Sequence, residues 1–229
     1  LIRRMIINKL ENIAGYLDYL KQNKPEQDIL FQDLLISVTS FFRDTKVFDS
    51  LCKTVFPHLV KDKSPDNPLR IWIAGCSTGE EAYSMAICLH EHLGDNISSI
   101  KIQIFASDIS EKSIAKARSG SYYKKELEGI SESRLQQFFN KTDGSFQIKK
   151  ALRDMCVFAC HNFLKDPPFA KMDLISCRNT LIYMEPFLQK KALTTFHYAL
   201  NEKGFLLLGK SETTGNASNL FTVFGKNDK

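Results

Sequence analysis

A glycine-containing turn followed by two carboxylates carries the clearest chemical signal in the sequence. Gly75 and Gly79 lie in the stretch IWIAGCSTGEEAYS, where glycine permits a tight turn and close approach of a ligand to the backbone. Glu80 and Glu81 follow directly, so a pyrophosphate bound at this turn would face two negative charges. The turn also lacks the Lys-Ser/Thr pair of a phosphate-binding loop. It therefore predicts a site for a cationic ligand.

S-Adenosylmethionine (SAM) is a ligand of this kind. Carboxylates attract its sulfonium and ammonium groups, while backbone N–H groups can take its carboxylate. Asp108 ends the apolar segment IKIQIFASD, and an acidic residue at a strand end can accept both hydroxyls of a ribose. Asp108 follows Gly75 by 33 residues, more than the about 20 typical of dinucleotide enzymes. The alternative is that Asp108 only caps the next helix.

The stretch KDPPFAKMDLISCRNTLIYM, residues 165–184, allows two interpretations. Its Asp166–Phe169 part looks like the tetrapeptide with which nucleic-acid amino-methyltransferases hold a base. That role would put it at a strand end beside the cofactor, with the aromatic ring on a flipped base. Here it precedes the apolar strand at 172–177, and two prolines suit a loop before a strand better. Base methylation through Asp166–Phe169 remains the alternative.

Two regions of different periodicity must position these residues. Residues 1–60 repeat apolar side chains at helical spacing, as at Leu10 and Ile13, and predict an N-terminal helical domain. The charged segment 61–68 contains two prolines and is the expected linker. From 69 to 229, strands at 69–75, 100–108, 172–177 and 204–209 alternate with helices at 80–93, 111–118 and 186–200. This alternation predicts an α/β fold with a parallel sheet.

Residues 121–155 interrupt the alternation with a polar stretch. TDGS at 142–145 is a turn signal, and QIKKAL and MCVFACH are candidate short strands after it. We expect a helix at 131–140 and a small inserted antiparallel β-subdomain. Gly204 is expected to stop the helix at 186–200.

Composition excludes several classes of protein. The 229 residues carry a net charge of +5, and the charge is too modest, without a basic–aromatic run, to predict a nucleic-acid partner. No apolar run approaches the ~18 residues of a membrane span, so no membrane insertion is expected. Six cysteines without a CxxC pair predict a reduced, cytoplasmic protein. His90 and His92 fall on different helix faces without a third ligand, so no metal is expected.

Four stretches together resemble the CheR-type chemoreceptor glutamate methyltransferases, in that family's order and over nearly the whole chain. They are SVTSFFRD (37–44), RIWIAGCSTGEEAYSMAI (70–87), IFASDISEKSIAKARSGSY (104–122) and HNFLKDPPFAKMDLISCRNTLIYM (161–184). The resemblance implies a Rossmann-like class I SAM-dependent methyltransferase domain. It also implies an N-terminal helical domain and a small inserted β-subdomain. The chain resembles the CheR modules found inside longer fusion proteins, which would make it an excised, monomeric domain.

The resemblance also implies site residues. Positions that contact the cofactor in the family carry Thr39, Arg43, Glu80, Asp108, Asn162, Phe163, Arg178 and Asn179. Ser37 stands where some members have asparagine, and Gly75 is the candidate for close backbone approach. Arg43 and Tyr183 fall on the two side chains near the transferred methyl group. Their alternatives are a surface ion pair of Arg43 with Asp44 and a core aromatic role for Tyr183.

The implied reaction esterifies glutamate carboxylates on chemoreceptor signalling helices and leaves S-adenosylhomocysteine. Glutamate, with a pKa of about 4.3, is already ionised at neutral pH, so no general base is needed. Members that grip a receptor's C-terminal peptide have a longer, glycine-rich loop than NKTDGSFQI at 140–148, so no tethering peptide is expected. A SAM-binding sensor or scaffold without catalysis is the second alternative.

Overall fold

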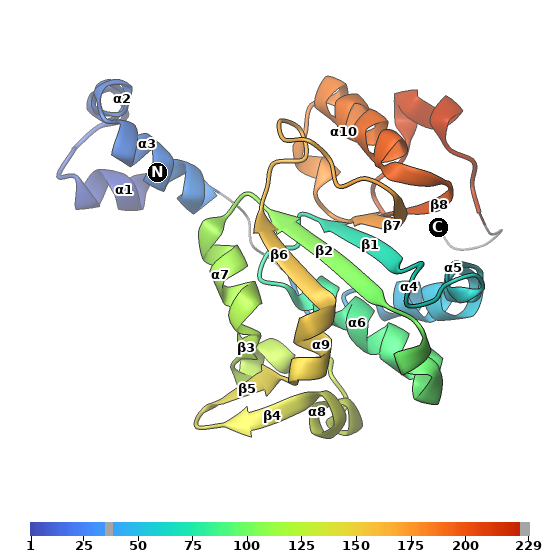
Figure 1. Ribbon diagram of the computed structural model, residues 1–229. Coiled ribbons are helices and arrows are strands. Elements are labelled where there is room, and N and C mark those ends of the chain that lie inside the picture. The colour runs from blue at the N-terminus through green and yellow to red at the C-terminus, as the bar shows by residue number, and fades with distance from the viewer. Residues whose placement is uncertain (35–38, 225–229) are drawn as a thin grey trace. The chain divides into compact units, whose positions relative to one another are not determined.

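The computed structural model describes residues 1–34 and 39–224 (Figure 1). The chain divides into two compact units, Leu1–Val38 and Thr39–Lys229. The sequence periodicity groups the helices at 45–60 with the N-terminal helices. In the structure they belong to the second unit. Phe48 and Phe56 share a buried cluster with Ile71 of the central sheet. Their apolar side chains therefore cover the sheet. Within the described ranges, every helix is too short or too polar to cross a bilayer.

The first unit consists of three helices, α1 (Ile2–Ile7), α2 (Ile13–Gln22) and α3 (Lys24–Leu34). Glu26 of α3 is buried, and its carboxylate accepts hydrogen bonds from Tyr16 Oη (2.8 Å) and Arg4 Nε (2.9 Å). The hydrogen bond from the Arg4 guanidinium lowers the pKa of Glu26 to about 2. The charge of Arg4 is thus paired inside the first unit.

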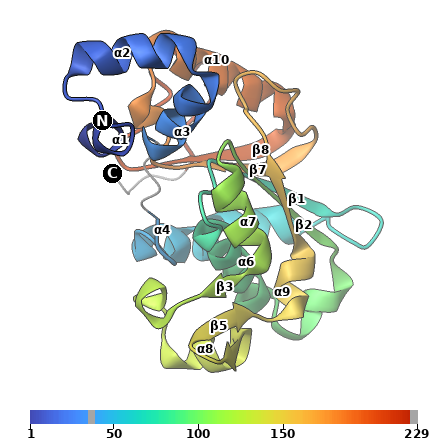
Figure 2. The same ribbon diagram turned by 90° about the vertical axis from the view of Figure 1, so that its left-hand side faces the viewer.

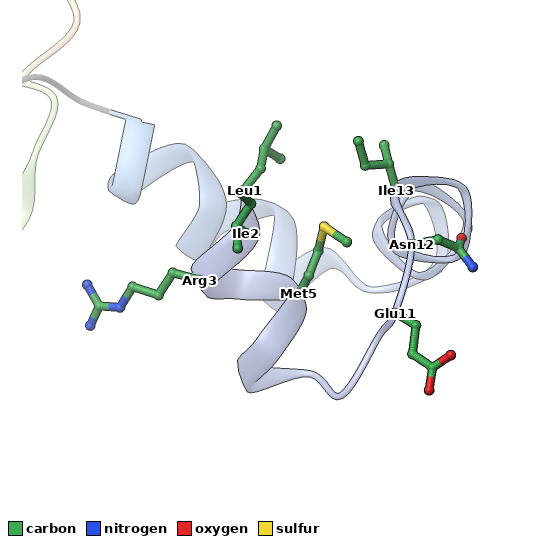
Figure 3. Close-up of a pocket in the computed structure, with 7 residues that line it drawn as sticks. All are labelled: Leu1, Ile2, Arg3, Met5, Glu11, Asn12 and Ile13. Carbon is green, nitrogen blue, oxygen red and sulfur yellow. The ribbon is translucent and has the colours of Figure 1, made fainter.

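An open apolar hollow lies on this first unit (Figure 3). Leu1, Met5 and Ile13 are among the residues that line it. None of the predicted cofactor or methyl-transfer residues belongs to its lining. The predicted site residues from Thr39 onward belong to the second unit.

The central sheet of the second unit has five described strands, all parallel, in the order β6-β2-β1-β7-β8. They are β1 (Leu69–Ala74), β2 (Ile102–Asp108), β6 (Cys156–Cys160), β7 (Met172–Cys177) and β8 (Leu200–Leu208). The chain moves outward from β1 through β2 to β6, then returns to the other side of β1 with β7 and β8. A sheet wound in this way binds ligands outside the carboxyl ends of its strands, where the strand order reverses.

Both faces of the sheet are covered because its strands are apolar on both faces. Ile71 and Ile73 of β1 belong to the cluster that contains α6 (Glu80–Leu93), while Trp72 and Ala74 belong to the cluster with α10 (Pro186–Ala199). This alternation follows the two-residue period of a strand. Figure 1 shows α6 and α10 on opposite faces of the sheet. The predicted α/β fold is confirmed.

Shorter helical elements complete the second unit. They are α4 (Thr45–Ser50), the π-helical η1 (Leu51–Val55), α5 (Phe56–Val60), η2 (Gly94–Ser99), α7 (Glu111–Ser119), η3 (Lys124–Leu127), α8 (Glu132–Phe138), α9 (Lys150–Met155), η4 (Leu181–Tyr183) and η5 (Gly215–Leu220). Ser110 caps α7, since its hydroxyl accepts a hydrogen bond from Ser113 N.

The inserted subdomain is a three-stranded antiparallel sheet in the order β3-β5-β4. Its strands are β3 (Ser121–Tyr122), β4 (Phe139–Thr142) and β5 (Ser145–Ile148). Both views show these strands gathered with α8 and α9 at one end of the unit, away from α10 (Figure 1 and Figure 2). The candidate strand at 155–161 is present as β6, but its placement in this subdomain was wrong, because β6 pairs with β2 in the main sheet. The candidate strand at 147–152 was mostly wrong, since α9 begins at Lys150.

Gly204 does not stop a helix. Helix α10 ends at Ala199, and Gly204 lies inside β8. A Cβ atom on Gly204 would lie 3.0 Å from the carbonyl oxygen of Met172, where the register of β7 and β8 is irregular. The glycine therefore serves a close approach of two strands.

Candidate active site

Most predicted site residues follow the carboxyl ends of four neighbouring parallel strands. Gly75 follows β1, Asp108 ends β2, Asn162 and Phe163 follow β6, and Arg178 and Asn179 follow β7. Carboxyl ends of parallel strands meet at one edge of a sheet, so the fold brings these residues together. Thr39 is half-buried at the start of the same unit, whereas Ser37 lies outside the described residues.

Glu80 begins α6 and is only 3% exposed. Its two carboxylate oxygens lie 2.8 and 2.7 Å from the Thr78 hydroxyl, and no described basic side chain forms an ion pair with it. Burial raises the pKa of Glu80, while the Thr78 hydroxyl opposes this shift. A buried carboxylate without a cationic partner is well suited to a ligand's ammonium group.

Glu81 has a different role from its neighbour. Its carboxylate accepts hydrogen bonds from Ser176 Oγ (2.6 Å) and from Arg178 Nη1 (3.0 Å). Its negative charge is therefore already paired within the protein. Of the two carboxylates expected to attract a cation, only Glu80 remains available.

Asp108 joins two loops of the candidate site. Its carboxylate accepts hydrogen bonds from Ser77 N (2.8 Å) and Ser110 N (2.9 Å). The side chain of Ser110 caps α7, so Asp108 is more than a helix cap. A carboxylate offers about four lone-pair positions, so acceptor capacity remains for ribose hydroxyls. Ser77 Oγ is buried and has no hydrogen-bond partner among the described residues, which fits a polar ligand at this turn.

Gly75 adopts a left-handed conformation with φ of +79°, which favours glycine. A Cβ atom there would lie 2.5 Å from Thr180 Oγ1, in the loop after β7. The glycine is thus required by the contact between two loops of the protein itself. Contact of its backbone with the cofactor stays a prediction.

Asn162 and Phe163 differ in exposure. Phe163 is buried and packs against Phe196 of α10, at 5.4 Å between ring centroids. Its backbone therefore has the better opportunity to face a ligand. Asn162 lines a small hollow with Ile109 and His161 at the ends of β2 and β6. Its Oδ1 accepts a hydrogen bond from Leu164 N (3.0 Å), so its side-chain NH2 group has the better opportunity to meet a ligand.

Phe169 is half-buried and packs against the core. Its ring centroid lies 4.8 Å from that of His161, 5.1 Å from Trp72 and 5.2 Å from Phe105. The ring that would have to stack on a flipped base thus already contacts three aromatic neighbours. The contacts agree with a packing role for Phe169 in the loop before β7.

Arg178 fixes the turn that carries Arg43. Its side chain is 1% exposed, and Nη2 donates to the carbonyl oxygen of Arg43 (2.8 Å) and to Asp44 Oδ2 (2.9 Å). Phe42 and Asp44 have φ of +51° and +61°, which costs non-glycine residues on the order of 1–3 kcal/mol each. The hydrogen bonds that Arg178 donates to this turn, and the one that Phe42 N donates to Ser84 Oγ, offset this strain. The hydrogen bonds of Arg178 to the described residues all serve the protein, so its contact with the cofactor remains a prediction.

The structure excludes the alternative for Tyr183 and shows which distant residues pair with Asp44. Tyr183 is 62% exposed, so a core aromatic role is wrong. Leu181, two residues earlier, is the buried side chain of η4. The carboxylate of Asp44 forms ion pairs with Arg178 and with Lys210 Nζ (2.8 Å). Both of these partners come from segments distant in the sequence, and the charge of the adjacent Arg43 also contributes to the lowered pKa of Asp44.

Ser84 is a site-supporting residue that the motifs did not reveal. Its hydroxyl accepts a hydrogen bond from Phe42 N (2.9 Å) and donates to the carbonyl oxygen of Glu80 (2.7 Å). Ser84 is fully buried on α6. A polar residue on the buried face of an amphipathic helix was the available signal.

The doubly wound parallel sheet, the glycine turn after β1 and the acidic end of β2 define a class I SAM-dependent methyltransferase fold. A family model described as CheR methyltransferase, SAM binding domain, matches residues 37–229. The chain therefore belongs to the CheR methyltransferase family. The predictions of the fold class, the family and the SAM cofactor are confirmed.

Named relatives cover most of this chain. It is 31% identical to chemotaxis protein methyltransferase 2 of Vibrio cholerae, over 97% of this chain and 79% of that protein. It is 32% identical to a chemotaxis protein methyltransferase of Borreliella burgdorferi, over 93% and 78%. It is also 38% identical to an uncharacterized 104.1 kDa protein of Rhodobacter capsulatus, over 96% of this chain. The chain spans 23% of that larger protein.

Proposed function

We propose that the protein transfers the methyl group of SAM to glutamate side chains of chemoreceptor signalling domains. Family membership and the chemotaxis methyltransferase names of two relatives support this acceptor. The carrying observation is one hydrogen-bonded network. Arg178 links the carbonyl oxygen of Arg43 to Glu81, and Glu81 adjoins Glu80 at the start of α6. The arginine assigned to the acceptor and the carboxylate assigned to the cofactor thus share one rigid support.

The residues divide the work between cofactor and acceptor. SAM, when bound, supplies an electrophilic methyl group on a sulfonium. Glu80 would hold its ammonium group, and Asp108 its ribose. Arg43 would orient the acceptor carboxylate, since a guanidinium pairs with a carboxylate through two parallel hydrogen bonds. Tyr183 would steer the incoming oxygen. The acceptor is ionised at neutral pH, so the chain needs no general base.

The short hairpin of the inserted β-subdomain supports methyl transfer that needs no tethering peptide. Strands β4 and β5 are joined at residues 143 and 144 alone, and Gly144 has φ of +75°. A two-residue hairpin of this kind leaves no long loop to grip a receptor's C-terminal peptide. We therefore propose that the domain recognises the signalling helices directly.

The first test replaces the two methyl-site residues. Arg43→Ala should lower kcat/KM about 30-fold through lost orientation, and Tyr183→Phe about fivefold. Transfer of labelled methyl from SAM to a purified receptor signalling domain measures both, while circular dichroism checks the fold. Tyr198→Phe is the matched control, because Tyr198 is exposed on α10 and should leave the rate unchanged.

Each rival function predicts its own result. Unchanged rates for both variants would remove Arg43 and Tyr183 from the mechanism. S-Adenosylhomocysteine binding without transfer to any receptor would favour a sensor or scaffold. Label in oligonucleotides, together with salt-dependent filter binding, would favour base methylation.

The second test uses the raised pKa of Glu80. S-Adenosylhomocysteine keeps the ammonium group, which pairs best with an ionised Glu80. Its affinity should therefore increase as pH rises above 4.5, the ordinary pKa of a glutamate, and through the raised pKa of Glu80. The folding stability of the unliganded protein has the opposite pH dependence. Its raised pKa stabilises the fold below 4.5, and this contribution is lost as pH rises through the folded-state pKa.

Calorimetry across this pH range, in buffers of different ionisation enthalpy, should detect proton release on binding. Glu80→Gln should bind more weakly and lose this part of the pH dependence. Glu202→Gln, at an exposed position of β8, is the control. Identical pH profiles for wild type and Glu80→Gln would show that Glu80 does not hold the ammonium group.

A further inference from the structure

The short segment after β8 contacts two loops of the candidate site. Lys210 Nζ lies 2.8 Å from Asp44 Oδ1, beside the turn that carries Arg43. Glu212, two residues later, contacts the loop after β7, which carries Asn179 and leads to Tyr183. No motif in the sequence assigned a role to either residue.

The carboxylate of Glu212 is saturated by backbone donors. Oε1 accepts hydrogen bonds from Thr180 N (2.8 Å) and Leu181 N (2.7 Å), and Oε2 accepts from Asn179 N (2.9 Å) and Gly209 N (2.7 Å). A carboxylate has about four lone-pair positions, so none is left for a ligand. Hydrogen bonds to an ionised acceptor are roughly twice as strong as neutral ones. Glu212 is therefore a strong local clamp.

The geometry of the clamp requires special backbone on both sides. Asn179 has φ of +57°, a conformation that residues other than glycine adopt rarely. A Cβ atom on Gly209 would lie 2.7 Å from Glu212 Oε2 and 3.0 Å from Asn179 N. Glycine at 209 thus leaves the space in which the carboxylate meets three consecutive N–H groups of the neighbouring turn.

The turn held by Glu212 leads directly to Tyr183 of the proposed methyl site. Leu181, whose N–H is bound by Glu212, begins η4 and is buried, and Tyr183 ends η4 with an exposed side chain. Thr180 of the same turn lies so close to Gly75 that a Cβ atom on Gly75 would be 2.5 Å from Thr180 Oγ1. Loss of the clamp would let both Asn179 and Tyr183 shift relative to the glycine turn.

We propose that Glu212 is a positioning residue that holds the Asn179–Leu181 turn, and through it Tyr183, in register with the cofactor. The methyl-transfer part of this inference rests on the proposed function. Glu212 touches neither reactant in this scheme and acts only through the backbone of the turn.

Glu212→Gln tests the clamp with little change of shape. Glutamine keeps one oxygen, and its NH2 group faces N–H donors that it cannot accept from. We expect kcat/KM for methyl transfer to fall about 20-fold and the dissociation constant of S-adenosylhomocysteine to rise about tenfold. The control, Glu202→Gln, should change neither quantity more than twofold. Values for Glu212→Gln within twofold of wild type would overturn the proposal.

Amide hydrogen exchange separates positioning from a general structural role. In Glu212→Gln, the amides of Asn179, Thr180 and Leu181 should exchange at least about tenfold faster, with β7 amides at Leu174–Cys177 unchanged. Acceleration of β7 as well, or an unfolded variant, would show a general structural role and overturn the proposal. Affinity and exchange do not involve the acceptor. A wild-type protein that fails to methylate receptors would therefore refute the proposed function and still leave Glu212 testable.

Discussion

Replacing Asp108 with alanine is expected to weaken S-adenosylhomocysteine binding by at least about 100-fold, or about 3 kcal/mol of binding free energy. The carboxylate joins the glycine turn to the start of α7 through Ser77 N and Ser110 N. The substitution removes both of these bonds and the acceptor assigned to the ribose hydroxyls. Bonds to a charged acceptor contribute about 1.5–3 kcal/mol each, so losing the ribose contacts alone accounts for an effect of this size.

Two further variants show which part of the effect belongs to the ligand. Asp108→Asn keeps the shape and one acceptor oxygen, so it should retain part of the affinity, with a loss of about tenfold. Asp95→Ala, at an exposed position in η2, should bind as wild type does. Calorimetry measures all three. If Asp108→Ala binds with wild-type affinity, Asp108 serves only to join the two loops.

The elements that carry these residues could be predicted because each has a strong local signal. The helix at 80–93 was predicted with its observed bounds, since a glycine turn precedes it and its apolar residues repeat with helical period. The strand at 172–177 was also predicted with its observed bounds, and all six of its residues are buried. It is not a continuous apolar run, because Asp173 and Ser176 are buried in it with hydrogen-bond partners.

Pairings between distant segments could not be predicted in this way. The strand at 156–160 was recognised, but its pairing with β2 depends on the route of the chain around the subdomain. Arg178 and Glu81 are 97 residues apart, and no periodic pattern marks single charges that meet across a fold. The family motif located Arg178, and only the structure revealed the three groups to which it is bound.

The second large effect is expected for Arg178→Met, which should lower the free energy of unfolding by about 3–5 kcal/mol. The buried guanidinium bridges Glu81 and Asp44, whose side chains are 16% and 23% exposed. Its removal leaves Glu81 without its cation. Asp44 keeps Lys210, whose hydrogen bond is the main reason that the pKa of Asp44 is lowered. Urea unfolding, monitored by circular dichroism, measures the loss.

A double variant separates this stability effect from the positioning of Arg43. Arg178→Met with Glu81→Gln removes the unpaired carboxylate, so it should recover part of the lost unfolding free energy. It does not restore the bond to the carbonyl oxygen of Arg43, and the strained backbone at Phe42 and Asp44 stays without that support. Methyl transfer should therefore remain low in the double variant, even where the protein is fully folded. Recovery of both stability and transfer would mean that Arg178 stabilises the sheet edge without positioning Arg43.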